Sequence, residues 1–574
     1  MRWLPYSVTE SFPEEVVDWV TEFHFPKQLV PMLTKRGVLT ADQCRKLYFG
    51  RIEDTHSSTA FGIEMIKAVS RIHEAFINKE YVLVIGNNDV DGITGTALAV
   101  GVLKEMCKHY KFKLDYLIID VESDNRSIGS KFTTKIIEKK PNLIITVNFG
   151  IAWGSHIEEL NKFGIDVIVT DQQMSSDDFP HDAFAIIQPH FCGYPFKEIT
   201  GVGIAYQTMK ALWEVNEKKV PKWVAYDQLD LVALSAFPGS MELIDDNRIY
   251  VKNGLKGIEQ KNRLSFHIMS TISVFQYIER KSMWSYIIDV LRCSDTIVKL
   301  LISNDIEECK RILNYLEEAF KRLLDEETQI IDKGIPQLKS DYKNINVIIG
   351  EQSYNQAIFS NCINKFLDIR YRPTLLLKLD PDGYLRGIVW GLEGINLKDC
   401  IQHFNRYLIG CKGSQFKAEI SVPFEKAPSF FAELDQFMSD YHPDQWVQTH
   451  YWEGLLTSED IHENMFRALL GLEPTGLGFP KVFWRVTGNV VSEKILGDRK
   501  KTAKLVWNRN GEEITLPLVL TEKVSNIHFE QEHTLFGYME WNQFVNGIYF
   551  RAVDVDGNLV KERSLEMEGM LELG

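Results

Sequence analysis

Long apolar runs are missing from this sequence. No stretch approaches the roughly 20 consecutive apolar residues that a helix needs to span a bilayer. The opening residues, MRWLPYSVTESFPEE, also lack the charged, apolar and small-residue order of a secretory signal. We therefore predict a cytoplasmic protein that does not contact a membrane.

Paired cysteines and an excess of basic residues are missing as well. No two of the eight cysteines form a CxxC motif, which argues against a zinc site or a disulfide framework and predicts reduced thiols, mostly buried. The 64 Lys and Arg residues are outnumbered by 79 Asp and Glu, giving a net charge of −15. This charge argues against polyanion binding over the whole surface, although a local basic groove remains compatible with it. The cysteines are Cys44, Cys107, Cys192, Cys293, Cys309, Cys362, Cys400 and Cys411.

The stretch YVLVIGNNDVDGITGTALAV, residues 81–100, organises the rest of the chain. Four apolar residues predict a buried strand, a polar loop follows, and Gly92 opens a helix rich in small residues. Ligands of parallel α/β sheets bind at such strand ends, so Asp89 and Asp91 are expected in one crevice. Carboxylates at this spacing suit a hard divalent cation. The alternative is that these aspartates cap the following helix.

An alternation of strand and helix continues to about residue 170. Strands are predicted over 113–119, 143–147 and 166–170, with helices over 131–139 and 155–163. Repeated βαβ units imply a parallel, doubly wound sheet whose strand ends share one edge.

Five segments, in this order and spacing, resemble the DHH phosphoesterase superfamily, and most closely the RecJ single-strand-specific exonucleases. In that family, Asp and His side chains of these motifs hold two manganese or magnesium ions. Three of the corresponding positions keep their ligand group, Asp89, Asp91 and Asp171. The segments are GNNDVDG, TVNFGIA, VIVTDQQMSSDDFPHDAFAIIQPH, TGVGIAYQ and LDLVALSAFPGSMELIDDNR.

The other five positions depart from the family pattern. A carboxamide is neutral and a weak metal ligand compared with carboxylate or imidazole, so we predict no catalytic residues and no two-metal centre. Three aspartates would hold one hydrated ion weakly, if any, so no cofactor is expected, with Mn²⁺ or Mg²⁺ as the alternative. A carboxylate from Glu242 or Asp245 replacing a lost ligand is a further alternative. The degenerate positions are Asn87, Asn148, Gln172, Gln173 and Gly239.

The resemblance and the strand pattern together predict a fold and its boundaries. We expect an α/β protein with an N-terminal helical segment (1–79), a DHH-like domain (80–302), a long linking helix (303–335), a DHH-associated α/β domain (336–445) and an OB-like β-barrel (446–574). The helical segment is expected to pack on the domain that follows it.

Candidate nucleic-acid contacts are spread over three of these domains. The family resemblance points to Arg126, Trp390 and Lys412, although Arg126 also fits an exposed loop and Trp390 also fits core packing. In the barrel, Arg499, Lys500 and Lys501, with Lys494, Lys504, Trp484 and Trp507 nearby, predict a cation-plus-aromatic surface. The alternative is a solvated basic hairpin over a core that contains the tryptophans.

The sequence thus favours a RecJ-like pseudonuclease that acts as an adaptor for DNA replication, recombination or repair. Its expected partners are single-stranded DNA and a polymerase, helicase, single-strand-binding protein or active nuclease. An active 5′–3′ exonuclease with a rearranged metal site is the alternative, and a purely structural partner without DNA affinity is a third reading. Divergence of this depth is typical of a phage or another mobile element.

Overall fold

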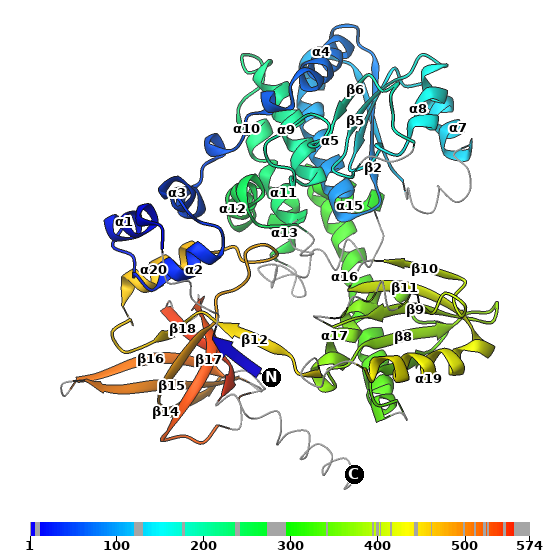
Figure 1. Cartoon of the computed structure of the whole chain (residues 1–574). Coiled ribbons are helices and arrows are strands. Elements are labelled where there is room, and N and C mark those ends of the chain that lie inside the picture. The colour runs from blue at the N-terminus through cyan, green and yellow to red at the C-terminus, as the bar shows by residue number, and fades with distance from the viewer. Residues whose placement is uncertain are drawn as a thin grey trace.

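A computed structural model gives the fold of the chain (Figure 1). It describes residues 2–5, 12–119, 130–174, 178–235, 241–271, 294–339, 342–392, 395, 397, 401, 403–413, 416–440, 446–460, 462–496, 500–509, 512–520, 524, 527–542 and 547–555. Among these residues, no helix combines the length and the apolar character needed to cross a bilayer.

The first α/β domain is built on a five-stranded sheet in the order β3-β2-β4-β5-β6, and every neighbouring pair is parallel. This confirms the predicted doubly wound sheet. A helix crosses over between successive strands from β2 to β5, as parallel pairing requires. The elements are β2 (Tyr81–Asn87), α5 (Val90–Tyr110), β3 (Lys113–Ile119), α7 (Ser130–Lys139), β4 (Leu143–Val147), α8 (Gly154–Asn161), β5 (Asp166–Thr170), β6 (Ala185–Ile187) and α9 (Gly201–Glu214).

Strands β2, β4, β5 and β6 are buried on both faces of the sheet, which explains their apolar runs. Along β2, Val82 and Val84 belong to one hydrophobic cluster, which also contains residues of α4 (Ile63–Ile77), α5 and α9. Leu83 and Ile85 point to the opposite cluster, which includes Ile136 of α7 and residues of α8. The alternation of side chains along each strand thus feeds two cores from one apolar sequence.

Helices follow the sheet and lead to the second domain. One long helix, α16 (Ile306–Gly334), begins at Asp305, whose carboxylate accepts from the amides of Glu307 and Glu308. It spans the region where we predicted a linking helix and reaches from the first domain to the second (Figure 1). The helices before it are α10 (Trp223–Tyr226), α11 (Leu229–Ser235), α12 (Asp245–Glu259), α13 (Leu264–Met269) and α15 (Ser294–Ile302).

The second α/β domain has a five-stranded sheet in the order β10-β11-β9-β8-β7, of which only the β7–β8 pair is parallel. Its elements are η3 (Ile335–Lys339), β7 (Asn346–Gly350), η4 (Gln356–Ile358), α17 (Phe359–Ile369), β8 (Thr374–Leu379), β9 (Tyr384–Trp390), β10 (Gly410–Gly413), β11 (Lys417–Pro423), η5 (Phe424–Lys426) and α19 (Ala427–Met438).

The C-terminal domain is a closed five-stranded barrel, as predicted. Its strands pair in the order β14-β15-β16-β18-β17, and β17 pairs back onto β14, which closes the barrel. Short strand β13 (Gly454–Leu456) pairs in parallel with β14, and α20 (Glu463–Gly471) precedes the barrel. The barrel strands are β14 (Trp484–Leu496), β15 (Lys500–Arg509), β16 (Glu512–Leu520), β17 (Gln531–Asn542) and β18 (Gly547–Val555).

The N-terminal segment does more than pack on the domain that follows it. Its first residues form β1 (Arg2–Pro5), which pairs in parallel with β12 (Thr449–Trp452), and the indole N–H of Trp3 donates to Asp554 at 2.8 Å. The sequence predicts only helices here, because a four-residue strand whose partner lies more than 400 residues away leaves no local pattern. The other elements are α1 (Glu14–Glu22), α2 (Leu29–Lys35), α3 (Ala41–Phe49), η1 (Ile52–Asp54) and η2 (Ser58–Phe61).

Candidate functional site

Three neighbouring strands of the first sheet end in the residues singled out from the sequence. Asn87 is the last residue of β2, Asn148 follows β4, and Asp171 follows β5. Asn148 has the left-handed φ of 60°, and its backbone N–H donates to the carbonyl of Thr170 at the end of β5. Asn is among the few residues that adopt this conformation readily. The turn therefore aims the Asn148 side chain along the carboxyl edge of the sheet.

Asp89 is at the centre of this edge. It is the N-cap of α5, and its Oδ1 accepts from the backbone N–H of Gly92 at 2.7 Å. Asn87 donates its Nδ2–H to Asp89 Oδ2 at 2.6 Å, and Asn148 Nδ2 lies 3.1 and 2.9 Å from the two carboxylate oxygens. Two carboxamides and one backbone amide thus surround the carboxylate, and the helix-capping alternative is confirmed for Asp89.

Asn148 itself is fixed from the other side by Gly201, the first residue of α9. Asn148 is 5% exposed, and its Oδ1 is buried without a hydrogen-bond partner. A Cβ atom at Gly201 would lie 2.1 Å from that oxygen, which is closer than any real contact. The helix can therefore approach the amide only because residue 201 has no side chain.

Asp171 is the most deeply buried acid of the group, at 1% exposure. Its carboxylate accepts from the backbone N–H groups of Ile151 and Gln173, each at 3.0 Å. Burial raises the pKa of Asp171 above its ordinary value, and the backbone hydrogen bonds oppose this rise while the Asp89 carboxylate adds to it. Gln172 accepts from the backbone N–H of Gly201 at 3.0 Å, so this side chain also ties β5 to α9.

The three aspartates are not gathered into one cluster. Asp91 lies in the first turn of α5 and is partly exposed. Among the residues that the structure describes, one group brings three potential ligand atoms within 4.8 Å of one another, and it is a different one: His56, Asp245 and Asp246. Gly239 and Arg126 lie outside the described residues, as does Arg499.

The remaining nucleic-acid candidates lie on strands of the second α/β domain and of the barrel. Trp390 ends β9, is partly buried and packs against a hydrophobic cluster of the second domain, with Lys417 Nζ 5.9 Å from its ring. Lys412 is on β10, and Lys500 and Lys501 are on β15. The prediction for Trp484 as a surface residue is wrong: it is 1% exposed and fills the barrel core, as the alternative reading had it.

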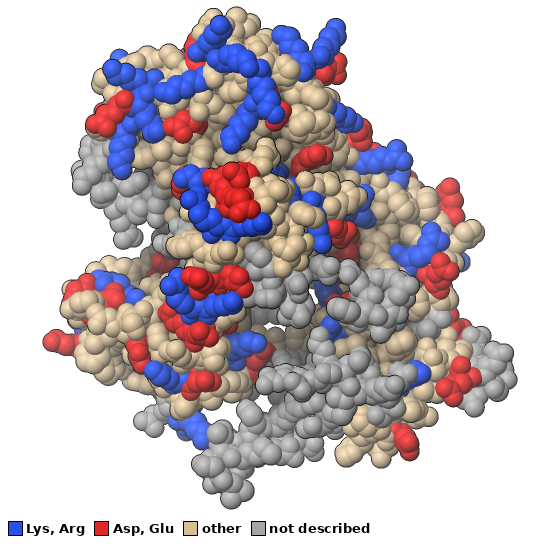
Figure 2. Space-filling model, turned by 180° about the vertical axis from the view of Figure 1, so that it is seen from behind, with Lys and Arg blue, Asp and Glu red and all other residues tan. Residues whose placement is uncertain are grey.

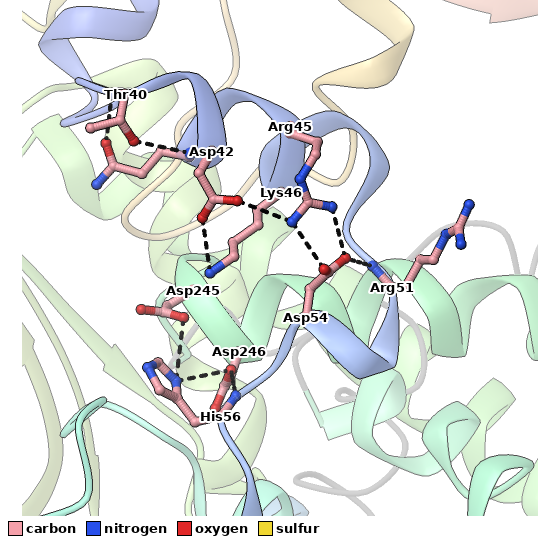
Figure 3. A network of polar contacts seen from close by, with 10 residues as sticks. Thr40, Asp42, Arg45, Lys46, Arg51, Asp54, His56, Asp245 and Asp246 are labelled. Atoms are coloured by element: carbon pink, nitrogen blue, oxygen red, sulfur yellow. Dashed lines mark hydrogen bonds and ion pairs between the residues drawn. The ribbon is translucent and has the colours of Figure 1, made fainter.

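A second polar cluster lies at the N-terminus of α12 and was not predicted from the sequence (Figure 3). His56 Nδ1 lies 3.2 Å from Asp246 and 3.7 Å from Asp245, and the backbone N–H of His56 donates to Asp246 at 3.0 Å. Tyr194 donates its hydroxyl proton to the other oxygen of Asp246 at 2.7 Å. Burial raises the pKa of Asp246, and its hydrogen bonds and His56 oppose the rise. Glu242 and Asp245 were the two carboxylates considered as replacements for a lost metal ligand. Asp245 faces His56, and Glu242 lies against Gly478.

The two residues after Asp246 tie the same helix to other parts of the chain. Asn247 donates to the carbonyls of Glu198 and Glu242, and accepts from the backbone N–H of Thr200, the N-cap of α9. Arg248 is 3% exposed and donates to the carbonyls of Leu472 and Pro474, just before the barrel. The three consecutive polar residues Asp246, Asn247 and Arg248 could have indicated these contacts from the sequence. Polar side chains that are buried at the start of a helix need hydrogen-bond partners elsewhere in the chain.

Comparison with known proteins agrees with this fold. A profile of the DHH family, N-terminal domain, matches residues 81–235. Single-stranded-DNA-specific exonuclease RecJ of Bacillus subtilis is 24% identical over 524 residues, which is 88% of this chain but only 64% of that protein, so the match leaves over a third of the relative uncovered. The protein of the same name from Haemophilus influenzae is 23% identical, over 78% of this chain and 81% of its own.

A solved structure matches over almost the whole chain. RecJ from Thermus thermophilus in complex with Mn²⁺ has a TM-score of 0.76 and covers 96% of this chain and 79% of its own, at 19% sequence identity. A complex of the same protein with Mg²⁺ has a TM-score of 0.70. At this identity the similarity establishes the fold, and the chemistry has to be argued from the residues of this chain.

Proposed function

This chain is a RecJ-like DHH superfamily protein, and from that premise we propose that it binds single-stranded DNA, together with a replication, recombination or repair protein, as an adaptor that does not cut the strand. The proposal concerns the carboxyl edge of the first sheet, where relatives named as exonucleases would carry out their reaction.

The observation that carries the proposal is the set of donors around Asp89. A metal ligand needs oxygen lone pairs directed at the ion, whereas the oxygens of Asp89 accept from Asn87, Asn148 and the Gly92 amide. The two carboxamides direct N–H groups, which repel a cation, at this carboxylate. We infer that these residues do not fit a pair of divalent cations.

The surroundings of Asp171 support the same proposal. Both of its oxygens accept backbone N–H groups, and burial favours its neutral form. Gln172, which stands at a position where the family has histidine, uses its side-chain oxygen to accept from the backbone N–H of Gly201. The pocket is therefore stabilised by hydrogen bonds of its own, as expected of a site that does not depend on metals.

DNA binding requires local positive charge on a chain that is acidic overall. Figure 2 shows Lys and Arg side chains gathering on the upper part of one face, over the first domain, with Asp and Glu among them. A sequence-independent contact with phosphates would make the affinity fall with salt concentration. The proposal therefore predicts salt-dependent binding of a single strand.

The test is digestion of a 5′-labelled single-stranded oligonucleotide with Mn²⁺ or Mg²⁺, combined with binding of the same oligonucleotide at two salt concentrations. We expect salt-dependent binding without nucleotide release. A variant in which Asn87, Asn148 and Gly239 are changed to Asp, and Gln172 and Gln173 to His, serves as the positive control for the scaffold. Metal-dependent release by the unchanged chain would overturn the proposal, as would the absence of binding.

A second candidate is an active exonuclease with a rearranged metal site. The cluster of His56, Asp245 and Asp246 favours it, because imidazole and carboxylate are suitable ligands and lie close together. Under this alternative the unchanged chain would release nucleotides with Mn²⁺, and His56→Ala would abolish that release. Under the adaptor proposal, neither the unchanged chain nor His56→Ala releases nucleotides.

A further inference from the structure

We propose that Phe191, at the rim of the carboxyl edge, stacks on a base of the bound single strand. This inference rests on the proposed DNA binding and assigns one contact within it. Phe191 directly follows the third of the five family segments and is not one of the residues singled out from the sequence.

A continuous chain of hydrogen bonds connects Phe191 to Asp171. The carboxylate of Asp171 accepts from the backbone N–H of Gln173, and the carbonyl of Gln173 accepts from Gln188 Nε2 at 2.8 Å. Gln188 Oε1 then accepts from the backbone N–H of Phe191 at 2.6 Å. Gln188 is 2% exposed, so this bridge is fixed inside the protein. The position of Phe191 is thus set by the same residues that build the edge.

The ring of Phe191 is nevertheless in solvent. Phe191 is 52% exposed, and Met174, next to Gln173 in the chain, is 67% exposed. The partly buried ring of Phe179 lies 5.4 Å from that of Phe191 and 4.9 Å from that of the exposed His181. An exposed Phe gains nothing from hydration, so a ring carried on a hydrogen-bonded turn beside Phe179 is a suitable platform for a flat apolar ligand.

Positive charge lies beside this platform. Lys197 donates from Nζ to the carbonyl of Pro189 at 2.9 Å, which holds the ammonium group near the turn that carries Phe191. A cation beside an aromatic ring is the combination with which single-strand-binding proteins hold a phosphate and the adjoining base. The aromatic face accepts any base, so we expect little sequence preference from this contact.

Phe163 provides a matched control within the same domain. It is 60% exposed and lies between α8 and β5, at the amino end of β5, whereas Gln173 and Phe191 lie beyond the carboxyl ends of β5 and β6. Replacing it removes the same side chain from the opposite edge of the sheet. The pair thus separates a role in DNA binding from the general effect of losing an exposed ring.

The experiment measures binding of a fluorescein-labelled oligothymidylate, and of the same strand with abasic sites, by full-length protein. We expect Phe191→Ala to raise the Kd about 5- to 100-fold and Phe191→Trp to restore it, with Phe163→Ala close to the unchanged protein. Abasic sites should weaken binding of the unchanged protein but have little further effect on Phe191→Ala. Thermal unfolding of each variant shows that it is folded.

The outcomes separate this inference from the function on which it rests. If the unchanged protein binds and Phe191→Ala binds equally well, the stacking contact is overturned while DNA binding stands. Equal losses in Phe191→Ala and Phe163→Ala also overturn it. If the unchanged protein does not bind the oligonucleotide, both proposals fail together.

Discussion

Asn148 donates its side-chain N–H to the carboxylate of Asp89, with Nδ2 lying 3.1 and 2.9 Å from the two oxygens. An amide here satisfies a carboxylate that would otherwise face the second acid, Asp171, in a poorly solvated pocket. Asn and Asp have almost the same shape, so this one position tests whether the pocket is built for hydrogen bonds or for metal ions.

We predict that Asn148→Asp destabilises the metal-free protein by about 1–3 kcal/mol, because a second carboxylate replaces the donor to Asp89. Excess Mn²⁺ should recover part of this loss in the variant and should have little effect on the unchanged protein. Chemical unfolding with and without Mn²⁺ measures both effects.

The control for this substitution is Asn161→Asp, which changes an exposed carboxamide that donates to the carbonyl of Asp182 at 2.7 Å. It should cost well under about 1 kcal/mol, as is usual for exposed positions. A strong stabilisation of the unchanged protein by Mn²⁺ would contradict our view of the pocket.

Gly201→Ala should be severely destabilising, by about 2–4 kcal/mol, because the new methyl group would collide with the Asn148 amide. Gly257→Ala, in α12, is the control: its Cβ would lie 3.5 Å from Asp230 Cβ, an ordinary contact, and should stabilise the helix by about 0.5–1 kcal/mol. Denaturant midpoints of the two variants should therefore move in opposite directions. Equal midpoints would show that Asn148 can shift to make room.

Much of the first domain could be predicted because its strands are buried on both faces. Strands β4 and β5 have the predicted bounds, 143–147 and 166–170, since each is an uninterrupted apolar run that ends in polar residues. Strand β6 pairs with β5, the strand just before it in the chain, but it has only three residues, so its own pattern is too short to detect.

The site was predictable in position but not in detail. Parallel strands bring the residues after β2, β4 and β5 to one edge, so the proximity of Asp89, Asn148 and Asp171 followed from the topology. The contact between Gly201 and Asn148 did not, because it depends on how closely α9 approaches the sheet. His56 was missed because its partner Asp246 lies 190 residues away in the chain.

Arg248 should matter for stability far more than an ordinary arginine. It is buried, donates to two carbonyls at 2.7 and 2.6 Å, and its guanidinium lies 4.4 Å from the ring of Phe479. We expect Arg248→Ala to cost about 3 kcal/mol or more, since two buried carbonyls lose their donors and the packing on Phe479 is lost. Thermal and chemical unfolding provide the measurement.

Arg45 is the matched control, because it forms ion pairs with Asp42 and Asp54 at the surface and its side chain is 41% exposed (Figure 3). Arg45→Ala should cost less than about 1 kcal/mol, as solvent screens exposed pairs. Similar losses in the two variants would mean that the contacts of Arg248 are no stronger than a surface pair.

Because of the partly buried Lys252, we predict that the free energy of unfolding increases with pH. Its Nζ lies 3.3, 2.7 and 3.1 Å from the carbonyls of Leu47, Tyr48 and Gly471, and burial, together with Arg248 and Lys256, lowers its pKa to about 8. Between about pH 8 and 10.5 the folded protein releases this proton while the unfolded chain still holds it. Stability must increase with pH wherever the unfolded state binds more protons.

We therefore expect the free energy of unfolding of the unchanged protein, relative to Lys252→Met, to increase by up to about 3 kcal/mol between pH 8 and 10.5. Below about pH 7 the lysine is protonated in both states, so the difference should be constant there and serves as the internal control. Urea unfolding at a series of pH values measures the difference. A curve that stays flat through about pH 10 would show that the ammonium group keeps its proton among the three carbonyls, and that these hydrogen bonds outweigh the cost of burial.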